Sequence, residues 1–581
     1  MAKSATSSPR NRSSRSGDLL ELAIGVGIVC VVLFIGSFLR VRADLTNEQR
    51  FTLTPATREM VEELPDIVYV KVYLTGGLPA DLQRLSQAAK DLLDEMRAYQ
   101  PDKIQYSFID PNASTDEKTR KQIYDQLQEQ GLTYSSIRLQ EAGAYSERII
   151  FPGALVTYRD KTVPVQLLKT QLRAPDAEIV NRSLNNLEYE MASAFRQAIT
   201  LKKPRIAFLE GQGELSGMQT NLLKEQYDVS TVRIDEKLDA LSIRPEKMNF
   251  RVNNYDALII AKPDSTFAGR DRYVIDQFIM NGGKVLWLID AMNANLDSLR
   301  TNQVSMARPY DLDLDDQLFA YGVRLNKDLL LDRNCAPIEI YTQPYGNQRK
   351  LERFPWYFEP VIIPTSGHPI VSNLDPTHLR FVGSLDTIAT DNVKKTILLS
   401  TSAYTRMLRN PVRVSLGVVE ADMGFDRTTT PYLPVAVLLE GNFTSAFVDL
   451  LPKEFTDDPT VGYREQGART AQIVISDGNV IENRIDPAKE MFYMLGFDRY
   501  ANSKIYGNRE LLINCMNYLL DDKALISIRS RAIALRQLDP QRVAMERSFW
   551  QIIAVALPIL ISILAGIAYH LYRRRRSTFT A

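Results

Sequence analysis

Two long apolar runs, one near each end of the chain, constrain this sequence more than any other feature. Residues 22–39 form 18 positions without a charge, and residues 549–572 form 24 such positions. At a rise of about 1.5 Å per residue, each run can cross the hydrocarbon core of a bilayer. A cleaved signal peptide is the alternative for the first run, but its apolar stretch exceeds the usual ~7–15 residues. We therefore expect transmembrane helices at 19–40 and 549–572.

Basic residues lie on the outer flank of both runs. Six Lys/Arg stand against two acidic residues before position 43, and four consecutive arginines occupy 573–576. Positive charge stays on the cytoplasmic side, so both termini are expected there and 43–548 is expected to be translocated. The Ser/Arg-rich segment 1–18 is predicted to be disordered, and 573–581 to be a basic tail. Because the whole chain has zero net charge, the translocated part is acidic, which argues against nucleic acid as a partner.

Residues 44–200 are predicted to form a first extracytoplasmic domain. A strand at 68–74 is followed by a helix with Leu82, Leu85, Ala89 and Leu93 at helical spacing, and by a strand at 104–109. A polar helix at 119–130, a hairpin of strands 148–158 and 162–168, and a helix at 184–199 complete the pattern. This order resembles a thioredoxin-like fold. The turn at 75–78 lacks the C-x-x-C of the redox members, which excludes thiol–disulfide chemistry.

Residues 203–525 are predicted to form one larger domain, since no linker-like composition divides them. Near-continuous apolar strands at 205–209, 255–261 and 284–290 alternate with helical segments such as 272–280. Such strands are typical of a parallel sheet covered by helices on both faces, as in flavodoxin-like folds. Further strands are expected at 381–388, 396–400, 435–439 and 472–476, and a helix at 510–520.

The carboxyl edge of this sheet is where a ligand would bind in a doubly wound fold. The candidate residues follow the predicted strands: Glu210, Gly211, Gln212, Gly213, Glu214, Asp264 and Asp290. The glycines at 211 and 213 are too few for a dinucleotide fingerprint, and the flanking glutamates would repel phosphate. A tight strand-to-helix turn is the favoured interpretation of this loop, and a ligand edge is the alternative.

Motifs for catalysis are incomplete throughout the sequence. Residues 281–284 (NGGK) lack the phosphate-loop spacing, and Val285 stands where a hydroxyl would bind magnesium. No G-x-S-x-G occurs, and the three histidines have no zinc-ligand spacing. Cys335 and Cys515 could form one disulfide, although two buried free thiols are the favoured alternative. We expect no enzyme, no cofactor and no metal.

Residues 526–548 are expected to connect the second domain to the second apolar run. Apolar and basic residues alternate over 526–536, which predicts a strand. The segment is either a solvated connector or a membrane-proximal collar that contacts a partner or lipid headgroups. The collar's candidate contacts are Arg529, Arg531 and Arg536.

Several short segments, taken in order, resemble the gliding-motility-associated ABC-transporter family called GldG and its auxiliary-domain relatives. They are RFTLT at 50–54, VKVYL at 70–74 with Leu78-Pro79, LEGQGE at 209–214, IDQFIMNGGKVLWL at 275–288 and LLDDKALISIRSR at 519–531. The second domain also resembles the GIFT domain shared with an intraflagellar-transport protein. Family members often carry histidine at the position of Gln212, so its absence weakens a chemical role for that loop.

The resemblance implies a non-catalytic subunit in a bacterial inner membrane, working with a separate ABC permease and ATPase, in gliding motility or envelope transport. The extracytoplasmic body would then be periplasmic. An alternative is a membrane-tethered module that binds carbohydrate or another envelope component at the 210–214 edge. A divergent hydrolase is the third hypothesis, which predicts a concave pocket with a titratable residue of shifted pKa.

Overall fold

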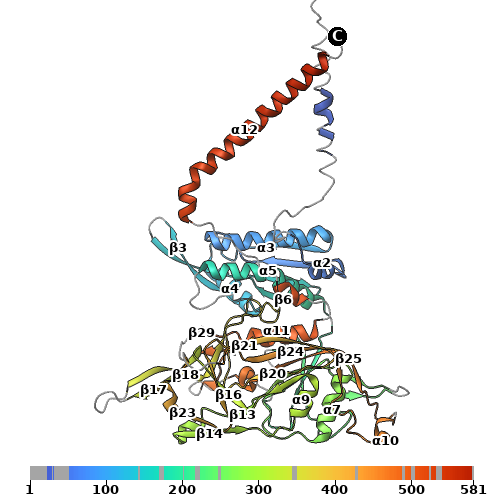
Figure 1. The fold of residues 1–581 in the computed structure, drawn as a ribbon. Coiled ribbons are helices and arrows are strands. Elements are labelled where there is room, and N and C mark those ends of the chain that lie inside the picture. The colour runs from blue at the N-terminus through green and yellow to red at the C-terminus, as the bar shows by residue number, and fades with distance from the viewer. Residues whose placement is uncertain are drawn as a thin grey trace, which may run out of the picture.

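The structure is a computed structural model of the 581-residue chain. It describes residues 23–28, 30–31, 34, 52–141, 144–168, 176–200, 202–215, 223–224, 226–245, 250–342, 350–425, 430–458, 460–483, 485–486, 491–498, 504–521, 525–530 and 540–578. Two α/β units are stacked, and the long helix α12 extends away from the first unit (Figure 1). The mixed α/β class predicted from the sequence is confirmed.

The first unit is built on a four-stranded sheet with the order β2-β1-β5-β6. Strand β1 runs parallel to β2 and antiparallel to β5, and β5 runs antiparallel to β6. The elements are α2 (Pro55–Glu62), β1 (Val68–Val72), α3 (Ala80–Tyr99), β2 (Ile104–Phe108), α4 (Glu117–Glu129), β3 (Ser135–Glu141), β4 (Ala144–Ile150), β5 (Gly153–Tyr158), β6 (Lys161–Gln166) and α5 (Asp176–Ile199).

Helix α3 shows why the sequence pattern succeeds in this unit. Its buried positions include Leu82, Leu85, Ala89 and Leu93, which follow the spacing of one helical face. Asp81 in the first turn and Arg97 in the last turn complement the helix dipole. The predicted β-α-β start is therefore confirmed.

One predicted element of this unit is wrong. The sequence indicates a single strand over 148–158, whereas positions 148–150 belong to β4, which pairs with β3 in a separate hairpin. The chain breaks at Pro152, which has no N–H to donate to a ladder. Strand β5 then starts at Gly153, where an added Cβ would lie 2.7 Å from Leu132 and 2.9 Å from the carbonyl of Val165.

The second unit is built on a seven-stranded sheet with the order β21-β24-β25-β12-β11-β7-β8. Strands β25, β12, β11, β7 and β8 are parallel, while β24 and β21 close one side in antiparallel pairing. The bounds are β7 (Arg205–Leu209), β8 (Asp228–Val232), β11 (Ala257–Ala261), β12 (Lys284–Leu288), β21 (Val393–Ser400), β24 (Pro434–Thr444) and β25 (Gln466–Ile475).

This sheet separates two hydrophobic cores, as the apolar strands predict. Leu258 and Trp287 face one core, which is covered by α7 (Gly269–Met280) and α9 (Asp315–Tyr321). Ile259 and Leu286 face the other core, which α11 (Asn508–Leu520) covers. The second core continues without interruption into the first unit, and α11 lies between the two units (Figure 1).

A smaller aromatic-rich layer is inserted between β12 and β24, with its own cluster around Trp356, Phe358 and Phe381. Its elements are β13 (Met292–Asn293), α8 (Ser298–Thr301), β14 (Val304–Pro309), β15 (Val323–Leu325), β16 (Asp328–Asp332), β17 (Cys335–Thr342), β18 (Lys350–Ile362), β19 (Thr377–His378), β20 (Leu385–Thr387), β22 (Thr405–Arg409), β23 (Val412–Ser415) and η1 (Leu416–Val419). The strand expected over 381–388 is only the short β20.

The remaining short elements lie between the strands of the large sheet and in the segment between β25 and α11. They are β9 (Ser242–Ile243), β10 (Val252–Asn253), α10 (Lys453–Thr456), η2 (Gly478–Ile481), β26 (Ile485–Asp486), β27 (Met491–Phe492), β28 (Phe497–Asp498) and β29 (Lys504–Ile505). Cys335 is half-buried, Cys515 is buried, and both are free thiols, which excludes the disulfide between them.

The strand predicted over 526–536 is wrong for the residues that the structure describes. Positions 525–530 form the 3-10 helix η3 (Leu525–Ser530), and 531–536 lie outside the described residues. Ile526, Ile528 and Arg529 are all buried, while Ser527 is exposed, so the basic Arg529 faces the interior instead of the solvent side that alternation assumes. Helices α2, α5 and α11 contact η3, and this packing overrides the local pattern.

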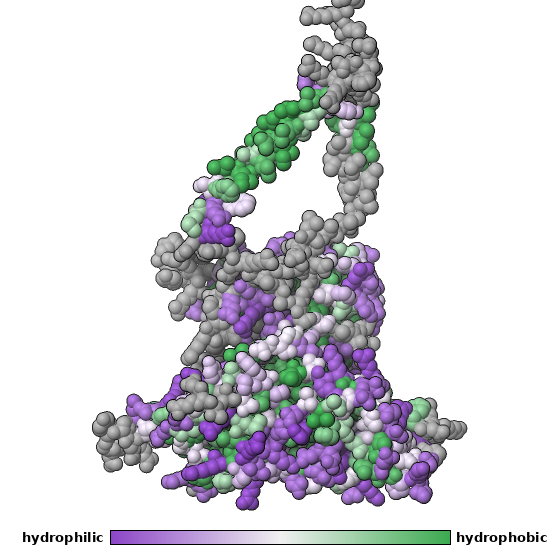
Figure 2. All heavy atoms as spheres, in the orientation of Figure 1, coloured by the Kyte–Doolittle hydropathy of each residue, from purple (hydrophilic) through white to green (hydrophobic). Residues whose placement is uncertain are grey.

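The C-terminal apolar run lies within α12 (Pro540–Thr578), a single helix that includes Pro558. Within it, Met545–Tyr572 is long and apolar enough to cross a membrane, and no part of the described protein covers it. Its uncovered apolar surface stands clear of the body in Figure 2. In the N-terminal run, the described residues are helical and exposed, while most of 19–40 and all of 1–18 lie outside the described residues. A two-pass topology therefore stays a prediction.

Candidate functional site

Four parallel strands of the large sheet end at one edge, and polar residues follow each of them. Glu210 follows β7, Lys262 follows β11, Asp290 lies two residues after β12, and Asp477 lies two residues after β25. Because carboxyl ends of parallel strands meet at one edge, this is the place where a doubly wound sheet binds ligands. The structure divides these residues into two clusters.

The first cluster is the loop after β7. The carbonyl oxygen of Gln212 accepts hydrogen bonds from the backbone N–H groups of Asp264 (2.9 Å) and Ser265 (3.2 Å). Gly213 has φ of 78°, and a Cβ there would lie 1.8 Å from the Asp264 carboxylate. The positive φ favours glycine here, and any larger residue would also displace the Asp264 carboxylate. The loop is thus a tight turn fastened to the end of the neighbouring strand.

Hydrogen bonds of the Gln212 and Glu214 side chains also hold this loop in place. Gln212 Nε2 donates to the buried Asp271 at 3.1 Å, and the Gln212 N–H donates to Glu214 Oε2 at 2.7 Å. Burial raises the pKa of the Glu214 carboxyl, and the charge of Asp264 adds to that effect. The Oε1 atoms of Gln212 and Glu214 are inaccessible and accept no hydrogen bond. The side chains of Gln212 and Glu214 therefore point inward, and Gly211 and Gly213 are exposed.

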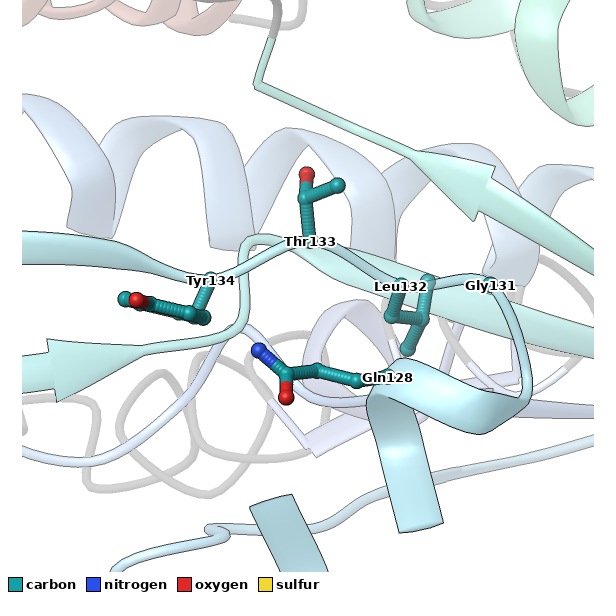
Figure 3. A pocket seen from close by; sticks show the side chains of 5 residues that line it. All are labelled: Gln128, Gly131, Leu132, Thr133 and Tyr134. Carbon is teal, nitrogen blue, oxygen red and sulfur yellow. The ribbon is translucent and has the colours of Figure 1, made fainter. Parts of the chain in front are cut away.

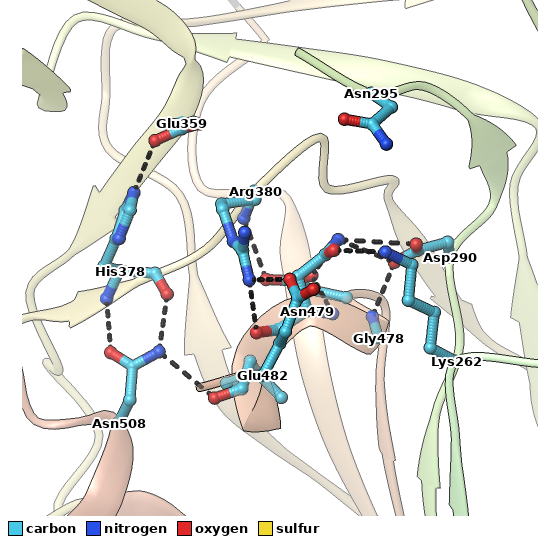
Figure 4. Close-up of polar contacts among 12 residues, drawn as sticks. Lys262, Asp290, Asn295, Glu359, His378, Arg380, Gly478, Asn479, Glu482 and Asn508 are labelled. Atoms are coloured by element: carbon cyan, nitrogen blue, oxygen red, sulfur yellow. Dashed lines mark hydrogen bonds and ion pairs between the residues drawn. The ribbon is translucent and has the colours of Figure 1, made fainter. Parts of the chain in front are cut away.

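The second cluster joins the ends of β12 and β25 (Figure 4). Asp290 accepts from the N–H of Gly478 at 2.5 Å, and Asp477 accepts from the N–H of Asn479 at 2.7 Å. The amide nitrogen of Asn479 donates to Asp477 (3.1 Å) and contacts both oxygens of Asp290 (3.4 Å). Two buried carboxylates, 3% and 0% exposed, thus share one asparagine.

Two cations border this acidic pair. Lys262 Nζ donates to the side-chain oxygen of Asn479 at 2.5 Å. Arg380 donates through its backbone N–H to Asp477 (2.8 Å) and through Nη2 to Glu482 (2.5 Å). Each charge is therefore engaged within the cluster.

Burial governs the protonation of the acidic pair. It raises the pKa of Asp290 to about 7, with the neighbouring Asp477 adding to the rise. Burial also raises the pKa of Asp477, although Arg380 opposes that change. Like charges in a low dielectric cannot both ionise cheaply, so the pair holds a proton near neutral pH.

The cluster continues toward the aromatic layer and α11 through His378. His378 Nε2 contacts Glu359 at 3.0 Å, and its backbone N–H donates to Asn508 at 3.0 Å. Asn508 returns a hydrogen bond to the carbonyl of His378 at 2.7 Å. These contacts fasten β19 to the start of α11 (Figure 4).

Little space is left beside these groups. A cavity of about 10 Å³ borders Asp290, with Tyr310 and the Asp315–Lys327 ion pair (2.6 Å) in its walls. This volume holds about one water molecule. Among the described residues, no group of three His, Cys, Asp or Glu side chains is placed to hold a metal ion. The geometry is that of a closed polar junction that fixes strand ends.

A larger hollow of about 340 Å³ lies in the first unit, between the end of α4 and the start of β3 (Figure 3). It is lined by Gln128, Gly131, Leu132, Thr133 and Tyr134. The side chain of Gln166 replaces a strand partner there, accepting from the N–H of Thr133 and donating to its carbonyl, both at 3.3 Å. None of these five residues is acidic or basic.

Of the three arginines expected to contact a partner or lipid headgroups, the structure describes only Arg529. Arg529 is 3% exposed and is an interior residue, so it cannot contact a partner or a lipid headgroup in this conformation. Its guanidinium donates to Asn514 (2.6 Å) and to the carbonyl of Ser372 (3.2 Å), and it lies over the ring of Tyr189. Arg531 and Arg536 lie outside the described residues.

The strand pattern predicts Asp290 and Lys262 at this edge, but Asp477 and Asn479 are not among the predicted residues. Asp477 and Asn479 follow the end of a parallel strand, as Asp290 does, so their position after the strand at 472–475 could have predicted them. Arg380 and Glu482 carry no such signal, because long-range folding alone brings them to the cluster.

The fold defines a mixed α/β protein with one helix, among the described residues, long and apolar enough to span a membrane. Comparison with family models specifies it further: the chain belongs to the family of ABC-type uncharacterized transport systems (ABC_transp_aux), which matches residues 203–515. Residues 47–157 match a domain of unknown function, DUF7088.

Two individual proteins are similar to this chain. An uncharacterized protein of Borreliella burgdorferi is 20% identical over 528 residues, covering 90% of each chain. The solved mmIFT52 N-terminal domain is 13% identical, with a TM-score of 0.27, covering 54% of this chain and 96% of that one. A structural likeness of this size carries no argument about the fold.

Proposed function

We propose that this protein is a non-catalytic accessory subunit of an ABC transporter, acting beside a separate permease and ATPase. The observation that carries the proposal is the family match over the large α/β unit. The closed polar junction at the sheet edge, whose charges are engaged internally, is consistent with a scaffolding role.

We further propose that α12 anchors the protein, that the run at 22–39 is a second anchor, and that the body is periplasmic. The uncovered apolar surface of α12 supports the first point, and the basic flanks of both runs support the orientation. The sheet order β2-β1-β5-β6 supports a thioredoxin-like first unit, and the parallel large sheet supports a flavodoxin-like or GIFT-type second unit. Membership of the GldG group, with a role in gliding or envelope transport, rests on the sequence resemblance alone.

The alternative of a carbohydrate- or envelope-binding module has less support. Its site would be the loop at 210–214, where the oxygen atoms of Gln212 and Glu214 without partners are inaccessible to solvent. A sugar-binding edge would instead present such groups outward for hydrogen bonding.

Co-purification tests the accessory role. The full chain with an affinity tag, extracted from its native membrane in mild detergent, should bring down a permease and an ATPase in stable proportion. A matched chain truncated before α12 should bring down less of both components, because the membrane contacts of α12 are gone while the proposed anchor at 22–39 remains. Isolation of the intact protein without transporter components, in several detergents and after cross-linking in whole cells, would contradict the proposal.

A further inference from the structure

Both connections between the body and the apolar runs are fastened to one helix, α5. The entry connection ends at Thr54, the N-cap of α2. The N–H and the hydroxyl of Thr54 both donate to Glu188 of α5 at 2.7 Å. The next residue of α5, Tyr189, is buried and receives the exit connection.

The exit connection is η3, the last described element before α12. Leu525, Ile526, Ile528 and Arg529 are each 2–3% exposed. The Arg529 guanidinium lies 5.3 Å from the centre of the Tyr189 ring and donates to Asn514 of α11. The segment is therefore inserted between the two units.

Polar contacts close the same junction on its other sides. Asn517 of α11 donates to the Tyr189 hydroxyl at 2.8 Å and accepts from the Tyr227 hydroxyl at 2.5 Å. Arg196 of α5 pairs with Asp521, whose other oxygen accepts from the N–H of Ile526 at 2.8 Å. Helix α5 thus holds the entry, the exit and the second unit through adjacent residues.

We infer that α5 is a coupling element: displacement of either membrane connection is transmitted through Glu188 and Tyr189 to the other connection and to both units. The inference rests on the proposed membrane attachment. Close-packed interiors have low compressibility and transmit strain. A movement of a transporter in the membrane would therefore move the body as one piece.

Hydrogen exchange on the full chain in detergent tests this coupling. Glu188→Gln removes the charge that holds Thr54 but keeps the shape of the side chain. The coupling predicts roughly tenfold faster exchange at the entry (52–57) and also at the exit (525–530), the scale of one lost charge-assisted hydrogen bond. Faster exchange at the entry alone would overturn the inference.

A second variant changes the exit connection instead, at Arg529 in η3. Arg529→Lys keeps the charge but loses the two-pronged contact with Asn514 and Ser372, and it should speed exchange at 525–530 and at the Thr54 end. Arg84→Ala, at an exposed arginine of α3, is the control and should leave both peptides unchanged. If the permease does not co-purify but exchange is reciprocal, the accessory role fails while the coupling stands.

Discussion

At the residue scale, the carboxyl pair of Asp290 and Asp477 is the chemically most distinctive feature of the protein. Both groups are buried, both are hydrogen-bonded, and their mutual repulsion is relieved by retaining a proton. Since Lys262 and Arg380 neutralise only part of the surrounding acid, the junction is less stable when Asp290 ionises.

The stability of the folded protein should depend on pH through Asp290. The folded state raises the pKa of Asp290 from its ordinary value of 3.8 to about 7. The folded protein therefore binds a proton that the unfolded chain releases, so its contribution to stability is fully present below about pH 4 and is lost as pH rises through about 7. Asp290→Asn should flatten this dependence and be more stable than the natural protein at pH 8, by on the order of 1–3 kcal/mol.

Urea unfolding of the purified full chain between pH 5 and pH 8 measures this effect. Asp102→Asn, at an exposed aspartate of the first unit, serves as the matched control and should keep the natural slope. A steep pH dependence that survives in Asp290→Asn would show that another group is responsible.

Among the helices and strands, local sequence patterns predict most of the elements whose form depends on residues nearby in the sequence. The strands at 205–209 and 284–288 and the helices α3, α7 and α11 were predictable because one face or both faces are apolar at a fixed period. The 3-10 helix η3 was not, because its form depends on α2, α5 and α11, which are distant in sequence. For the same reason, neither the burial of Arg529 nor the contact between Arg380 and Asp477 could be predicted from local sequence.

The turn after β7 gives a prediction at this scale. Gly213→Ala should destabilise the second unit by about 1–3 kcal/mol, because the residue has positive φ and its new Cβ would collide with Asp264. Thermal unfolding measures it, and Gly367→Ala, whose Cβ would meet nothing within 4 Å, should cost little.

A double variant separates the two causes. Adding Asp264→Ala to Gly213→Ala should restore part of the loss, since the collision disappears while the backbone strain remains. No recovery in the double variant would assign the whole cost to the backbone.

At the scale of the whole molecule, one hydrophobic core runs through both units. The junction around α5 adds ion pairs and hydrogen bonds to it, including Arg182 to Asp375 at 2.8 Å. The apolar patterns of residues 44–200 and 203–525 predict two separate domains, and no local pattern predicts that they share one core. The two units are therefore expected to unfold together.

The orientation of the body gives a prediction for the whole chain. Protease added to intact spheroplasts should digest the body at exposed loops and spare tags placed at both termini, because the basic flanks retain the ends inside. Immunoblots against each tag and against the body measure it, with lysed cells as the control in which all three are cut. Cleavage of the tags with an untouched body would invert the proposed topology.

The length of α12 has a consequence for the height of the body. Its 39 residues extend about 58 Å at the α-helical rise, roughly twice the thickness of a bilayer's hydrocarbon core. In the proposed orientation, the turns before Phe549 leave the lipid as an unbroken rod. Such a rod resists bending, so the start of α12 at Pro540 would stand at a defined height above the lipid.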